Sequence, residues 1–169
     1  MNYLTLALRL IHIPSGVLWV GGVLIMNFYI GPTVQATAES GRTFVGHLIG
    51  KTNFRNVMTV SGFLTVIAGA WLYWLDSAGF TTNWWRSGAG RGFGIGAFFA
   101  LIGLVAGIMV GRNTAALGQL GAQIQGKPTP EQLQKLQALQ RQQSIVGSIN
   151  VYSLILAVVF MAISRYLVF

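Results

Sequence analysis

Four long runs of apolar residues, separated by polar segments, dominate the hydrophobic pattern of the chain. The runs cover residues 3–30, 54–75, 91–112 and 145–168. Each approaches or exceeds the roughly 20 helical residues that cross a hydrocarbon core about 30 Å thick. A helix satisfies its own backbone hydrogen bonds, which lipid cannot do for it. The pattern therefore predicts an all-α protein in which residues 1–169 form a single domain, an antiparallel bundle of four membrane-spanning helices.

The polar connection after the first run contains a second, shorter helical pattern. Gly31 and Pro32 predict that the first helix ends there, because both residues disfavour a helix interior. Residues 42–50 then carry a short apolar stripe flanked by basic residues. A short helix with one apolar and one basic face lies in the plane of the membrane surface. We therefore expect an interfacial helix over residues 42–50.

The third run continues as a polar but helix-forming segment until residues 126–129 break the pattern. Thr129 and Gln132 have the spacing of a capping box, and Pro130 suits the first position of a helix. Nothing interrupts the helical pattern that follows before the fourth run, residues 145–168. The third and fourth helices should therefore form a hairpin that extends beyond the membrane on its cytoplasmic side. Its expected length is about five turns, or roughly 27 Å at 5.4 Å per turn.

Glycines recur at helical spacing along the third run and, less densely, along the second. In a membrane, glycines let two helix backbones approach closely, and van der Waals packing then holds the helices together. Glycines four apart along a span do not form the strand-to-helix turn that holds a nucleotide phosphate. We therefore predict helix packing through these positions, which are Gly92, Gly96, Gly103, Gly107 and Gly111 in the third run and Gly62 and Gly69 in the second.

The composition limits the chemistry that the chain can perform. Hydrophobic residues make up 53% of the 169 residues and charged residues only 8%, whereas roughly a quarter of the residues in soluble domains are charged. The absence of cysteine excludes disulfides, iron–sulfur clusters and thiolate nucleophiles. The three acidic residues lie in loops or near helix ends, which excludes catalysis by paired carboxylates. The net charge of +8 resides in loops and helix ends, so the lipid bilayer, not nucleic acid, is the expected partner.

Lysine and arginine are unevenly distributed between the two sides of the predicted bundle. Seven lie in loops 1 and 3, and four lie on the opposite side. Basic residues concentrate on the cytoplasmic side of membrane proteins. We therefore expect a multi-pass protein of the cell (plasma or inner) membrane with loops 1 and 3 in the cytoplasm and both termini outside. The seven are Arg42, Lys51, Arg55, Arg112, Lys127, Lys135 and Arg141, and the four are Arg9, Arg86, Arg91 and Arg165.

His12 is the one histidine inside a predicted membrane span. Charged side chains at the centre of a span cost roughly 3 kcal/mol on insertion scales, so His12 and Arg9 should face protein, a ligand or water. Both fall on one helix face with Trp19. Pro14 leaves the carbonyl of Leu10 without its helical donor, and this carbonyl or a neighbouring hydroxyl is a candidate partner for the imidazole. His12 is therefore a hydrogen-bonded packing residue, an axial ligand to a tetrapyrrole metal, or part of a labile copper or proton site.

Three arginines and one methionine are expected near the outer level of His12. Four antiparallel spans bring Arg9, Arg91 and Arg165 to the same membrane surface. There they either extend to lipid phosphates or hold carboxylates such as tetrapyrrole propionates. Met161 lies about as far from the end of the fourth run as His12 lies from the start of the first. Met161 is therefore either a core residue or the second axial ligand of a His/Met pair.

Three short segments, within residues 10–22, 60–69 and 161–166, resemble a loose group of four-helix membrane proteins. The group includes the copper-resistance D (CopD) domain, uncharacterised relatives and the HemJ-type membrane protoporphyrinogen oxidases. In the HemJ-type enzymes the first-helix histidine is linked to haem, and the resemblance implies this role for His12. Those enzymes also carry an essential lysine at the start of the third helix. Arg91 stands near that position here, so the resemblance does not extend to the oxidase activity.

Taken together, these patterns favour a small membrane protein that binds haem b or a related tetrapyrrole near the outer leaflet through His12. Its role would be in electron transfer or in tetrapyrrole handling. An alternative is a cofactor-free accessory subunit, in which the glycines of the third helix and the protruding hairpin pack against a second copy or a larger membrane complex. A third is the transport of copper or of a small solute.

Overall fold

The computed structural model describes residues 2–124 and 126–168, and within them all secondary structure is helical. Four helical segments are long and apolar enough to cross a membrane. The prediction of an all-α protein with four apolar helices of spanning length is therefore confirmed. The elements are α1 (Tyr3–Ile25), the π-helical turn η1 (Met26–Ile30), α2 (Gly31–Lys51), α3 (Phe54–Asp76), the 3₁₀ turn η2 (Asn83–Arg86), α4 (Gly88–Gln123), α5 (Pro130–Ile163) and the 3₁₀ turn η3 (Ser164–Tyr166).

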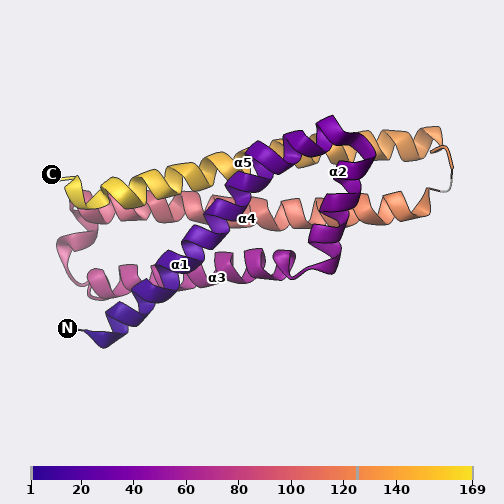
Figure 1. Ribbon diagram of the computed structural model, residues 1–169. Helices are drawn as coiled ribbons and strands as arrows, with labels where there is room; N and C mark the ends of the chain where they lie inside the picture. The colour runs from indigo at the N-terminus through magenta and orange to yellow at the C-terminus, as the bar shows by residue number, and fades with distance from the viewer. Residues whose placement is uncertain (1, 125, 169) are drawn as a thin grey trace.

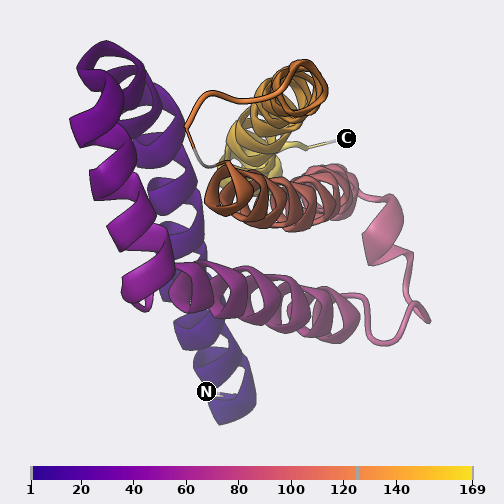
Figure 2. The ribbon, with the colours of Figure 1, turned by 90° about the vertical axis from the view of Figure 1, so that its right-hand side faces the viewer.

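The long helices pack as two pairs. α4 packs along α5, and α1 packs on α3. Figure 1 shows α3, α4 and α5 with nearly parallel axes, with α1 crossing them obliquely and both chain ends at one end of the molecule. Seen from the side, α1 and α2 lie together on one flank of α4 and α5 (Figure 2). The interface between α1 and α3 and the interface between α4 and α5 are therefore the two places where side chains of the spans meet most closely.

The sequence pattern predicted that the helical path ends at Gly31 and Pro32, but in the structure it continues through them. The backbone N–H of Gly31 bonds to the carbonyl of Met26 in the wider π-helical turn, and α2 follows without a gap. Pro32 occupies the first turn of α2, where its missing N–H is not needed. The helical path bends instead at Ala38, which has a φ of 48° and a ψ of −107°.

The segment predicted as an interfacial helix, residues 42–50, forms part of α2 beyond this bend. α2 runs across the direction of α3, α4 and α5 (Figure 1). If those three helices stand upright in a membrane, this half of α2 lies along its surface. The bend at Ala38 therefore converts a steep helix into one that runs across the bundle.

The hairpin between α4 and α5 is held at its turn by a capping box. The Thr129 hydroxyl accepts from the N–H of Gln132, and the Gln132 side chain accepts from the N–H of Thr129, at 3.2 and 3.0 Å. α5 begins at Pro130 and continues unbroken to Ile163. Both helices run on past the level at which α2 crosses them (Figure 1). The structure therefore contains a long helical hairpin whose turn lies well beyond α2.

α4 and α5 approach closely along the glycines of α4. A Cβ atom built on Gly103 would lie 2.6 Å from Cδ2 of Leu154, and one on Gly107 would lie 3.3 Å from Nδ2 of Asn150. The Asn150 side chain donates to the carbonyl of Gly103 at 2.6 Å. Gly111 differs, because nothing lies within 4 Å of its Cβ position. The other two glycines also meet the C-terminal part of the chain: Gly92 meets Ser164 of η3, and Gly96 meets Met161 of α5.

These contacts correct one part of the accessory-subunit hypothesis. The glycines of α4 were expected to offer a surface to a second copy or a larger complex. From Gly92 to Gly107 that surface is covered by α5 and η3 of the same chain. Because the backbones already approach closely there, no second chain can dock on these positions without displacing α5.

Candidate functional site

His12 lies in the interface between α1 and α3, where its half-buried ring bonds to the backbone of α3. Its Nδ1 atom is 2.7 Å from the carbonyl oxygen of Thr65. A carbonyl oxygen can only accept a hydrogen bond, so Nδ1 must carry the proton. In the neutral imidazole the other nitrogen, Nε2, then has a free lone pair. This bond therefore holds the ring in the tautomer that can ligate a metal through Nε2.

Gly69 makes room for the imidazole on α3. A Cβ atom at this position would lie 2.7 Å from Cε1 and 2.9 Å from Nδ1 of His12. Real Cβ atoms essentially never approach so closely, and any larger residue would displace the ring from Thr65. The sequence indicated Gly69 as a helix-packing residue, and the structure shows that what packs there is the ring of His12.

Two buried hydroxyl groups tie α1 to α3 one turn from the imidazole. The Thr65 hydroxyl lies 3.0 Å from the Ser15 hydroxyl and 2.7 Å from the Ser61 carbonyl, so its single proton has two acceptors within reach. The Ser15 hydroxyl donates to the carbonyl of Ile11 within α1. These bonds satisfy polar groups inside an apolar interface and fix the position of the residue whose carbonyl receives His12.

The acceptor that the sequence suggested for His12 is not the one it uses. Pro14 lies within α1, and the freed carbonyl of Leu10 or a neighbouring hydroxyl was the candidate partner. The imidazole instead crosses to Thr65, 53 residues away in the chain. Side chains that bond to their own helix reach the carbonyl four residues earlier, as Ser15 reaches Ile11. Leu10, in contrast, is two residues from His12 and lies on a different helix face. Nothing in the sequence singled out Thr65 as this partner.

Trp19 continues this face of α1 one turn beyond Ser15. It is almost fully buried, and its indole ring packs on Gly62 of α3, where a Cβ atom would lie 3.1 Å from Cε2. The second glycine predicted in α3 thus serves the same interface as Gly69. His12, Ser15 and Trp19 therefore all face α3, as expected of residues that share one helix face.

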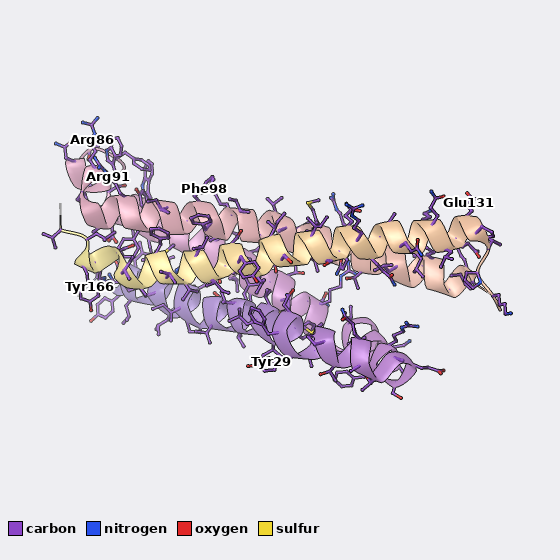
Figure 3. The ribbon with its side chains drawn as sticks, turned by 90° about the horizontal axis from the view of Figure 1, so that it is seen from above. Tyr29, Arg86, Arg91, Phe98, Glu131 and Tyr166 are labelled. Atoms are coloured by element: carbon purple, nitrogen blue, oxygen red, sulfur yellow. The ribbon has the colours of Figure 1, made fainter. Side chains whose placement is uncertain are left out.

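The three arginines expected near His12 lie at the same end of the molecule and are exposed. Arg9 belongs to α1, Arg91 to the first turn of α4 and Arg165 to η3. Figure 3 labels Arg86 and Arg91 at this end, together with Tyr166 beside Arg165. Their exposure leaves all three free to meet carboxylates or phosphates from outside the chain, and the structure pairs none of them with His12.

Met161 lies in the other helix pair. Its side chain packs on α4, where a Cβ atom on Gly96 would lie 3.1 Å from the methionine Cε. His12 occupies the interface of α1 with α3. The structure therefore does not bring these two side chains into one interface, and the observed contacts of Met161 are those of a core residue.

The described residues contain few other metal ligands. No group of three or more His, Cys, Asp or Glu side chains occurs among residues 2–124 and 126–168. A bare copper or zinc ion is usually held by several such side chains. A tetrapyrrole supplies four nitrogen ligands itself and needs only one or two from the protein. One histidine is the number of protein ligands that a five-coordinate tetrapyrrole metal requires.

An apolar hollow on α3 does not belong to this site. It measures about 500 Å³ and is lined by five residues of α3, Val66, Ile67, Ala70, Trp71 and Trp74. At 100° per residue these positions centre on a different face of α3 from Thr65 and Gly69. The hollow therefore faces away from His12.

No protein-family model, curated protein or solved structure matches this chain. The resemblance to the CopD and HemJ-type proteins therefore stays a hypothesis. The site has to be interpreted from the contacts of its own residues.

Proposed function

We propose that this protein binds haem b or a related tetrapyrrole through Nε2 of His12, close to the membrane surface at which both termini lie. The observation that carries the proposal is the bond between Nδ1 and the carbonyl of Thr65. Metal-ligating histidines almost always donate their second ring nitrogen to a carbonyl, a carboxylate or water. Such a bond orients the ring and makes Nε2 a stronger ligand.

The residues around His12 would each have a defined task. Thr65 holds the ring, Gly69 provides the space for it, and Ser15 helps to keep Thr65 in place. A bound tetrapyrrole would supply one-electron chemistry. The protein would supply the ligand, its orientation and an apolar surrounding, which together tune the reduction potential. With the chemistry supplied by the tetrapyrrole and its binding and orientation supplied by the protein, the proposed role is electron transfer or tetrapyrrole handling.

The exposed arginines at the same end suit the propionates of a tetrapyrrole. Arg9 lies one turn from His12 on α1, and Arg91 and Arg165 lie at the same end of the bundle. Their contacts would be open to lipid headgroups and water, so each would contribute little. We therefore assign the affinity chiefly to His12 and treat the arginines as secondary contacts.

The absorption spectrum of the purified protein tests the proposal. Protein from cells supplied with haem should show a Soret band, and the His12→Ala variant should lack it. A colourless wild-type protein would favour the cofactor-free accessory subunit instead. The observation that favours this alternative is the hairpin beyond α2. It exposes Leu133 on α5 and offers a partner a helical surface outside the spans.

For the topology, we propose that the hairpin and α2 face the cytoplasm of the cell membrane and that both termini face outward. Seven basic residues lie on the side of α2 and the hairpin, against four at the other end. Figure 3 shows Glu131, beside the hairpin turn, at the end opposite Arg86 and Arg91. The excess of basic residues supports a cytoplasmic hairpin.

Because the chain has no cysteine, single-cysteine variants report the topology directly. Asn83→Cys lies in η2 and Gln134→Cys in the hairpin part of α5, and both positions are exposed. A membrane-impermeant maleimide added to intact cells should label the first variant and not the second. Labelling of Gln134→Cys alone would reverse the proposed orientation.

A further inference from the structure

The part of α2 beyond the bend is set apart from the rest of the bundle. Ala38 turns the helix, and Gly41 lets the two halves of α2 come together, because a Cβ atom there would lie 2.7 Å from Cα of Val34. The segment after the bend then runs across the direction of α3 towards the start of that helix (Figures 1 and 2). It therefore lies along one side of the bundle at a single level.

This segment combines exposed basic and apolar side chains. Arg42 and Lys51 on α2 and Arg55 in the first turn of α3 are exposed, and so is Phe44, by 56%. Glu39 is the one acidic residue of α2, and the whole chain has only three acids against 11 basic residues. Most of the positive charge therefore needs a counter-charge from outside the chain.

An apolar hollow lies on the inner side of the bend. It measures about 200 Å³, and its lining includes Ile30, Val34, Gly41 and Phe44. Arg42 directly follows one of these residues in the chain. An apolar hollow beside an exposed cation fits a molecule with a hydrocarbon chain and a negatively charged head.

We propose that Arg42, Phe44, Lys51 and Arg55, the α2 surface, bind anionic phospholipid. The three cations hold the headgroup phosphates, while Phe44 and the hollow at the bend contact an acyl chain. Each lysine or arginine near an anionic membrane contributes about 1 kcal/mol of attraction, or roughly fivefold in binding. The neighbouring apolar residues distinguish this surface from one suited to nucleic acid, which pairs cations with phosphates and needs no acyl contact. The proposal does not depend on a bound tetrapyrrole.

Lipid binding to the detergent-purified protein tests this inference by native mass spectrometry. The test variant carries Arg42→Gln, Lys51→Gln and Arg55→Gln. The matched control carries Lys127→Gln, Lys135→Gln and Arg141→Gln, which removes equal charge from exposed positions of the hairpin. Phosphatidylglycerol and phosphatidylcholine are titrated into each protein, and circular dichroism verifies that each variant remains helical.

The wild type and the hairpin variant should prefer phosphatidylglycerol. The α2 variant should bind it at least roughly tenfold more weakly. An excess of inorganic phosphate should not displace the lipid, because phosphate lacks the acyl contact. An equal loss in both variants would reduce the effect to net charge and overturn the proposal. A wild type with no preference for phosphatidylglycerol, or one stripped of lipid by phosphate, would overturn it as well.

Discussion

Gly103→Leu should force α4 and α5 apart and lower the stability of the protein. The Cβ atom alone would come within 2.6 Å of Leu154, a nearly fully buried residue, before the rest of the leucine side chain is placed. Moving the helices apart would also break the bond from Asn150 to the carbonyl of Gly103. Overpacking and a buried amide without a partner together cost roughly 3–5 kcal/mol.

Gly111→Leu is the control, since it introduces the same side chain two turns further along α4. Nothing lies within 4 Å of the Gly111 Cβ position. Both changes gain the same helix propensity, about 1 kcal/mol relative to glycine, so the difference between the variants isolates packing. Thermal unfolding in detergent, followed by circular dichroism, should show a clearly lower midpoint for Gly103→Leu alone. Equal midpoints would mean that α4 and α5 do not pack through Gly103.

Gly69→Ala should weaken tetrapyrrole binding strongly, although less than the loss of His12 itself. His12→Ala removes the proposed ligand and should abolish the Soret band. The added methyl group of Gly69→Ala pushes the imidazole away from Thr65, because its carbon would lie 2.7 Å from Cε1. Loss of a bond that orients a metal-ligating histidine costs roughly 10–100-fold in affinity. Haemin titration of the purified apoproteins, followed by absorbance, measures both effects.

Gly21→Ala serves as the control for this series, because nothing lies within 4 Å of that Cβ position in α1. It should bind haemin like the wild type. The titration also separates the ligand role from a packing role. If His12 is only a packing residue between α1 and α3, His12→Ala and Gly69→Ala should lower the unfolding temperature. Any haemin binding seen with the wild type should then be unchanged in both variants.

The features that sequence reasoning predicted well depend on local chemistry. Four apolar runs dictate four helices, because lipid leaves the backbone no other partner. The capping box at Thr129 and Gln132 involves residues three positions apart, so its spacing is visible in the sequence. The spacing of Gly103 and Gly107 likewise indicates one helix face before the neighbouring helix is known.

The features that were missed depend on contacts between distant parts of the chain. The helix continues past Pro32 through a π-helical turn that precedes it, and no sequence signal distinguished that turn. The partner of His12 is a backbone carbonyl, which every residue possesses, so Thr65 could not be singled out. Equal depth in the membrane suggested that Met161 meets His12. Depth does not decide which helices are neighbours, and Met161 packs on Gly96 instead.

Haem ligation by His12 is tested most directly by the visible spectrum of the wild-type protein, purified from cells that have ample haem and kept in mild detergent. We predict a Soret band that shifts on reduction, disappears in His12→Ala and persists in Gly21→Ala. A wild-type protein that is colourless and also fails to bind added haemin would contradict this ligation. The bond from His12 to Thr65 would then serve only to hold α1 against α3.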